Sequence, residues 1–128
     1  MIRYLTPEQV LFLHSRLIEE TGGAHGVRDL AMLLSALGRP QATFDGNEFY
    51  ADIFYKGAAL MDSLICNYPF VDGNKRTAIA AVGLFLHLNG YSLRVKNEEM
   101  VRFTLTCTQS QSTLEEISLW LRKFSALL

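Results

Sequence analysis

The stretch that decides the fold is residues 68–89, which read YPFVDGNKRTAIAAVGLFLHLN. Its second half, residues 78–88, is apolar nearly all round a helical projection, and a helix of that kind is covered by other elements. We therefore expect a central, buried helix over residues 74–89, ended by Gly90. Pro69 and Gly73 break the chain before this helix and predict a loop there.

Periodic apolar residues predict further helices on both sides of this segment. The first is expected after Thr6, with Gln9 as its capping-box partner, and the last from a capping box at Ser112-Thr113-Leu114-Glu115. The expected helices cover residues 7–21, 28–37, 49–67, 97–107, with Asn97 as cap, and 112–124. Turn formers over residues 38–47 indicate an exposed flap with two very short strands, and residues 91–95 read as a short strand. The pattern predicts an all-α bundle with a small β-hairpin-like flap.

Composition limits what the chain does. It has 128 residues, a length for one domain over 1–128, and a net charge of −1 that gives no basic footprint for nucleic acid or an anionic membrane. Residues 78–88 fall short of a membrane span, and the N-terminus lacks the apolar run of a signal peptide. Two cysteines without metal-ligand spacing favour a reducing compartment. We expect a soluble intracellular protein.

The start of the central helix has an unusual charge pattern. A helix N-terminus carries partial positive charge and free N–H groups, so acidic residues are favoured there, yet this helix begins with Lys75 and Arg76. Gly73 allows the preceding backbone to curl into an anion-binding nest, and Asp72 is placed to hold a divalent cation that bridges phosphates. These residues predict a phosphate site. A plain turn between helices, with solvated Lys75 and Arg76, is the alternative from spacing alone.

The segment resembles the Fic-domain signature His-Pro-Phe-x-Asp/Glu-Gly-Asn-Gly/Lys-Arg, and most closely its death-on-curing (Doc) toxin branch. Matching flanks occur in order along nearly the whole chain: Thr21-Gly22-Gly23, Gly26-Val27-Arg28-Asp29, residues 39–44, Asn67, residues 74–78 and Asn89-Gly90-Tyr91. The resemblance implies an all-α Fic fold with a nucleotide site at the start of the central helix. Fic proteins generally transfer AMP from ATP to a hydroxyl, whereas Doc toxins transfer the γ-phosphate of ATP to a threonine of elongation factor Tu and stop translation in the bacterial cytoplasm.

The resemblance also implies roles for individual residues. Asp72 would help to bind Mg²⁺, and Phe70 would anchor the loop in the core. The phosphates of ATP would be cradled by Gly73, Asn74, Lys75 and Arg76. Docking of the target segment would involve the flap, with Arg39, Thr43 and Phe44.

Two sequence features refine this expectation. AMP-transferring members usually carry a second arginine three residues after the first, and Ile79 stands there, which favours phosphate transfer. Many Fic proteins also restrain themselves with a helix bearing Ser/Thr-x-x-x-Glu-Gly/Asn, and neither Ser15 nor Ser112 begins such a pattern. The resemblance then implies an external brake, a Phd-like antitoxin that docks in a surface groove.

The most consequential departure is Tyr68, which stands where the family has its catalytic His. An imidazole with a pKa near ~6.5 can accept the proton of the attacking hydroxyl, whereas a phenol near ~10 is already protonated at neutral pH. We therefore expect slow or absent transfer, and the larger Tyr ring also intrudes toward the γ-phosphate position. The alternatives are a non-catalytic pseudoenzyme that binds the antitoxin, AMP transfer, and self-modification of the Tyr68 hydroxyl.

The remaining reactive side chains read as structural. His14, His25 and His87 have no metal or triad spacing and are expected to be structural or surface residues, and Cys66 and Cys107 to be small core residues. Trp120 has core spacing. Tyr50 and Tyr55 are equally compatible with the core and with a groove.

Overall fold

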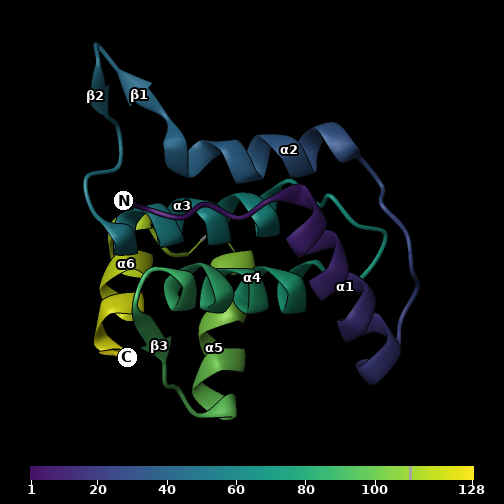
Figure 1. Cartoon of the computed structure of the whole chain (residues 1–128). Coiled ribbons are helices and arrows are strands. Elements are labelled where there is room, and N and C mark those ends of the chain that lie inside the picture. Colours follow the sequence, from purple (N-terminus) through teal and green to yellow (C-terminus); the bar gives the residue numbers. More distant parts are fainter. Residues whose placement is uncertain (110) are drawn as a thin grey trace.

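The computed structural model describes residues 1–109 and 111–128. Its helices are α1 (Pro7–Thr21), α2 (Leu30–Gly38), the 3₁₀ turn η1 (Arg39–Gln41), α3 (Ile53–Cys66), α4 (Asn74–Leu88), α5 (Asn97–Thr108) and α6 (Leu114–Lys123). Its strands are β1 (Thr43–Phe44), β2 (Asn47–Glu48), β3 (Tyr91–Leu93) and β4 (Ser125–Leu127). The predicted all-α bundle with a small hairpin is confirmed (Figure 1).

The central helix lies where its sequence predicts. Each residue of α4 from 77 to 86 is buried or half-buried, because α3, α1 and α5 all pack against this helix (Figure 1). The wholly buried face of α4 is formed by Thr77, Ala78, Ala81, Val82, Phe85 and Leu86. The helix α3 also packs on α6, so α3 and α4 form the centre of the bundle.

Caps account for where several helices begin. Thr6 and Gln9 form the predicted capping box of α1. For α6 the box is Thr113 with Glu116, one residue later than predicted, since both pairs have the required spacing. The helix α3 begins at Ile53 rather than near Phe49, because the Asp52 carboxylate accepts hydrogen bonds from the N–H groups of the first turn.

Two further boundaries differ from prediction. Lys96 is the N-cap of α5 and Asn97 its first helical residue, without a side-chain cap, so the expected capping role of Asn97 is wrong. Cys66, expected in the core, is exposed at the last residue of α3, whereas Cys107 is buried as expected. Position at a helix end, where the chain leaves the bundle, explains the exposure of Cys66.

Both small sheets are antiparallel pairs. Thr43 lies opposite Glu48 across the predicted hairpin, whose turn places Asp45 and Gly46 at φ values of 53° and 80°, the left-handed region that Asp-Gly turns use. The predicted strand at 91–95 is β3, and it pairs with β4 near the C-terminus, Tyr91 opposite Leu127. Sequence reasoning missed β4. Within the described part of the chain, each helix is too short or too polar to span a bilayer.

Candidate functional site

The loop between α3 and α4, residues 67–73, is fixed to the core through Phe70, which is 1% exposed. The Asn74 side chain binds both polar groups of the Phe70 backbone: its Oδ1 accepts from the N–H at 2.9 Å and its Nδ2 donates to the carbonyl at 3.0 Å. From α1, the buried His14 ring stacks on the Phe70 ring, and its Nε2 lies 2.7 Å from the Asp72 carbonyl oxygen. Because a carbonyl only accepts, Nε2 carries the proton.

The helix α4 begins directly after this loop, and no side chain of the N-cap residue caps its first N–H groups. Gly73 is the N-cap, has φ 77° in the left-handed region, and contributes no side-chain cap. A Cβ at this position would lie 3.0 Å from Ile18 Cδ1, so a larger residue would have to displace that methyl group as well as adopt a left-handed conformation. Free N–H groups and the helix dipole make this end suited to an anion.

Asp72 stands just before this helix end with its carboxylate exposed and held in place. Oδ1 accepts a hydrogen bond from Gly73 N–H at 2.8 Å, and Oδ2 accepts one from Ala24 N–H at 3.1 Å. These backbone hydrogen bonds, Ala24 first and then Gly73, lower the pKa of the Asp72 carboxyl below its ordinary value. The carboxylate therefore stays charged at neutral pH.

A magnesium ion fits Asp72 only together with phosphate. The described residues contain no group of three His, Cys, Asp or Glu side chains that would hold a metal ion alone. Mg²⁺ is commonly bound by one or two carboxylates, with phosphate oxygens and waters completing its shell. Each Asp72 oxygen receives one hydrogen bond and retains a lone pair for such an ion.

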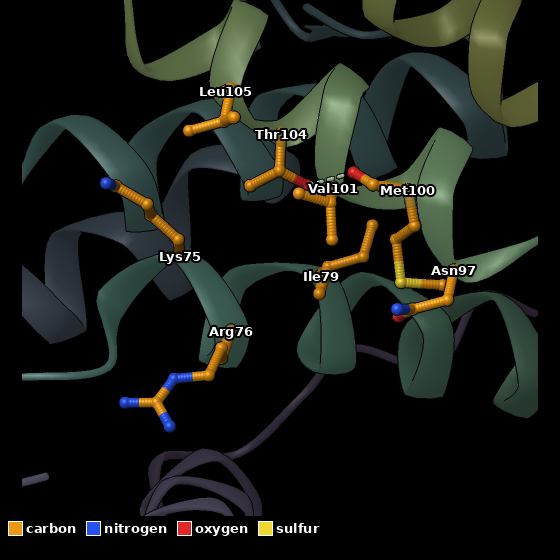
Figure 2. Close-up of a pocket in the computed structure, with 8 residues that line it drawn as sticks. All are labelled: Lys75, Arg76, Ile79, Asn97, Met100, Val101, Thr104 and Leu105. Carbon is orange, nitrogen blue, oxygen red and sulfur yellow. Dashed lines mark hydrogen bonds between the residues drawn. The ribbon is translucent and has the colours of Figure 1, made fainter. Parts of the chain in front are cut away.

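The two cations of the first turn point in different directions (Figure 2). Arg76 reaches toward α1, where its Nη1 contacts the Thr21 hydroxyl and lies 3.2 Å from the Gly22 carbonyl oxygen. Lys75 is exposed, and its side chain extends away from that of Arg76 (Figure 2). Arg76 is thus hydrogen-bonded to the end of α1, and Lys75 is exposed to solvent.

Lys75 and Arg76 line two neighbouring hollows. A polar hollow of about 410 Å³ is lined by Tyr68, Val71, Asp72, Gly73, Asn74, Lys75 and Arg76. It contains all the predicted phosphate and metal residues and the predicted catalytic position. An apolar hollow of about 250 Å³ between α4 and α5 is lined by Lys75, Arg76, Ile79, Asn97, Met100, Val101, Thr104 and Leu105 (Figure 2).

Comparison with known proteins places this geometry in a family. The sequence model of the Fic/DOC family matches residues 4–86. The chain is 47% identical over 93 residues to the Toxin Doc of Mycolicibacterium smegmatis, covering 73% of this chain and 69% of that protein. The chain belongs to the Fic/DOC family. It is also 28% identical over 122 residues to the Protein kinase doc of Escherichia phage P1, covering 95% of each.

In this Fic/DOC chain, Ile79 is half-buried and lines the apolar hollow one turn after Lys75 and Arg76. The side chain therefore adds apolar surface at the place where AMP-transferring members are expected to have a second arginine. Tyr68 lines the polar hollow and is 52% exposed.

The hairpin is not brought to this hollow. It leads into the N-terminus of α3, whereas the loop 67–73 leaves the C-terminus, and a helix of 14 residues is about 21 Å long. Thr43 and Phe44 are exposed. Arg39 points inward instead: its guanidinium donates to the Tyr50 hydroxyl at 2.9 Å and the Asp62 carboxylate at 2.8 Å.

Sequence reasoning missed two residues that shape the loop. His14 is predicted to be a structural or a surface residue, and it is buried and structural. Its contacts with Phe70 and Asp72 also make it part of the support of the loop before α4. Arg28, taken only as part of a flanking match, bonds the backbone of residues 67–69. Both contacts join residues about 40 or more positions apart, so no local pattern signals them.

Proposed function

We propose that the chain is a Doc-like toxin whose chemistry is transfer of the ATP γ-phosphate to a threonine of elongation factor Tu, attenuated by Tyr68. The observation that carries this proposal is the polar hollow at the uncapped N-terminus of α4, whose lining includes Tyr68, Asp72, Lys75 and Arg76. The relatives named Toxin Doc and Protein kinase doc support the coarser part of this proposal, a Doc-like toxin with kinase chemistry.

The residues of the hollow have separate roles in this proposal. The first N–H groups of α4, with Lys75 and Arg76, bind phosphate oxygens and offset their charge. Asp72 would hold Mg²⁺, which would supply charge neutralisation of the phosphates. The hollow thereby binds a polyphosphate with its terminal group near position 68.

The transfer step requires a proton acceptor at position 68. The threonine oxygen bonds to the γ-phosphorus, the bond from that phosphorus to the β–γ bridging oxygen breaks, and ADP leaves. The threonine proton must go to a base, which an imidazole provides and a protonated phenol does not. Loss of general-base help costs about 10²–10⁴-fold in rate, so Tyr68 attenuates the protein.

Two alternatives are weighed by specific observations. AMP transfer is disfavoured because Ile79 is an apolar, half-buried residue at the second-arginine position. A non-catalytic role, in which the chain binds an antitoxin and nucleotide only, is favoured by Tyr68 itself. Position of a radiolabel separates the three: γ-label on the target indicates phosphate transfer, α-label indicates AMP transfer, and no label even from Tyr68→His indicates the binding role.

The proposal includes a partner and a place of action. A Phd-like antitoxin would restrain the toxin in the bacterial cytoplasm, its tail seated in the apolar hollow between α4 and α5, because an occupant there would contact Lys75 and keep phosphate out. Docking of the target on the hairpin rests on the exposed Thr43 and Phe44, while Arg39 would serve by holding the base of the hairpin.

Induction in bacteria without the antitoxin tests the toxin reading. We expect growth arrest from the Tyr68→His variant and continued growth with the unaltered chain. Continued growth in both, with both proteins present at equal level, would favour the binding role.

A further inference from the structure

Position 68 has a backbone conformation that a tyrosine rarely adopts. Tyr68 has φ 47°, in the left-handed region where side chains other than Gly, Asn and Asp are disfavoured. The other described non-glycine residue with positive φ is Asp45, in the hairpin turn, where such a conformation is ordinary. Conformations of this kind persist only where neighbouring contacts over-determine them.

Those contacts come mainly from Arg28, a residue outside the signature motif. Its Nε donates to the Tyr68 carbonyl at 2.5 Å, and its Nη2 donates to the Asn67 carbonyl at 2.8 Å. Its own backbone N–H donates to the Pro69 carbonyl at 2.8 Å. One residue thus binds three consecutive carbonyls, the first of them at the C-cap of α3.

The location suits a cation. The last carbonyls of a helix lack intrahelical partners and carry partial negative charge, so a guanidinium there satisfies them and interacts favourably with the dipole. A planar guanidinium also fixes two acceptors in one geometry, which a single ammonium cannot do. A further backbone hydrogen bond joins the same two segments, because Val71 N–H donates to the Gly26 carbonyl at 3.1 Å.

We propose that Arg28 is a positioning residue that holds position 68 in its left-handed conformation and thereby directs the side chain at that position into the phosphate hollow. The inference deepens the proposed function, because direction matters only if position 68 serves the transfer. A base displaced by about 1 Å loses on the order of 10²-fold in rate.

The first test needs no activity. NMR of the unaltered chain, Arg28→Ala, Arg28→Lys and the control Arg16→Ala would measure the Cα chemical shift of Tyr68 and amide exchange at Val71. We expect Arg28→Ala to move the shift out of the left-handed range and to accelerate Val71 exchange about tenfold or more, with interior α4 amides unchanged. Added guanidinium should reverse both effects in Arg28→Ala. Arg28→Lys keeps the charge and stem if the Ala variant fails to fold, and we expect an intermediate effect.

The second test uses the Tyr68→His background. We expect Arg28→Ala to lower kcat for phosphate transfer about 10- to 100-fold with the ATP KM within about threefold, because the base moves while the phosphate residues stay. Unchanged shift and exchange in Arg28→Ala, or a raised ATP KM with unchanged kcat, would overturn the proposal. If Tyr68→His itself transfers nothing, the proposed function fails, and the NMR comparison still decides the role of Arg28.

Discussion

His14 stacks on Phe70 with their ring centroids 3.8 Å apart and their planes 6° apart. The pair joins α1 to the loop before α4, and the same imidazole reaches the Asp72 carbonyl. The loop before α4 is therefore held by the His14 ring stacked on Phe70 and by the Asn74 side chain, which hydrogen-bonds to the Phe70 backbone. This support explains how an exposed loop keeps Asp72 and position 68 in a fixed relation to the helix end.

Phe70→Ala should lower the free energy of unfolding by about 3–5 kcal/mol, because it removes a fully buried ring and leaves a cavity beside His14. Denaturant unfolding measures this loss of unfolding free energy. Phe12, 63% exposed on α1, provides the matched control, and Phe12→Ala should change stability by about 0.5 kcal/mol or less. Equal losses in the two variants would contradict the anchoring role of Phe70.

Lys75→Ala and Arg76→Ala should each weaken ATP binding roughly tenfold or more, since a hydrogen bond to a charged group contributes about 1.5–3 kcal/mol. Calorimetry with Mg²⁺ and ATP measures the affinity, and Lys123→Ala on α6 is the control. ATP affinity that stays the same in both variants would remove the phosphate-site assignment.

The base of the hairpin rests on a buried cation. Lys56 is 0% exposed, and its Nζ lies 3.0 Å from the Pro40 carbonyl oxygen and 3.1 Å from the Glu48 carboxylate. Burial by itself lowers the pKa of Lys56, but the Tyr4 and Glu48 side chains more than offset this, so the net pKa is raised. Lys56 remains charged in the folded protein.

Glu48→Ala should accordingly cost about 1–3 kcal/mol of stability, because the buried ammonium loses its carboxylate partner. Glu20→Ala, which breaks the exposed Arg16–Glu20 pair, should cost about 0.5 kcal/mol or less. Chemical denaturation of both variants gives the comparison, and a Glu48→Ala loss as small as the Glu20→Ala loss would refute the hairpin anchor.

The two cysteines should differ in reactivity and in their effect on stability. Burial raises the pKa of the Cys107 thiol to about 11 from its ordinary 9.0, so it stays protonated and protected, whereas Cys66 is exposed. A maleimide at neutral pH should label Cys66 first and Cys107 only on unfolding.

The same shift sets a pH dependence. A raised folded pKa contributes stability that is full below pH about 9 and is lost as pH rises toward about 11. The difference in unfolding free energy between the unaltered chain and Cys107→Ala should therefore shrink over that range. A difference that stays constant from pH 8 to 11 would contradict the buried, protonated thiol.

Structure that depends on a few neighbouring residues can be predicted from the sequence. The capping box of Thr6 and Gln9, the apolar run of α4 and the Asp45-Gly46 turn each specify structure within a few residues, and each is found. The pairing of β4 with β3 was missed because three residues near a chain end carry little pattern.

In the candidate site, too, features set by local sequence can be predicted, whereas contacts between distant residues cannot. The position of Gly73, Lys75 and Arg76 at the start of α4 follows from backbone and sequence patterns alone, and their role in binding phosphate stays a prediction. The contacts of His14 with Phe70 and of Arg28 with Tyr68 depend on how α1 and the loop before α2 fold against the motif. Side chains from separate elements have no sequence spacing that would reveal such contacts.

The central claim is that position 68 limits phosphate transfer. Its most direct test is the rate at which the purified unaltered chain and its Tyr68→His variant move the γ-phosphate of ATP to elongation factor Tu, with Mg²⁺ present. We predict that the variant is faster by about 10²–10⁴-fold, with threonine as the modified residue. Equal rates in the two proteins, or no γ-phosphate transfer by the Tyr68→His variant, would contradict the account.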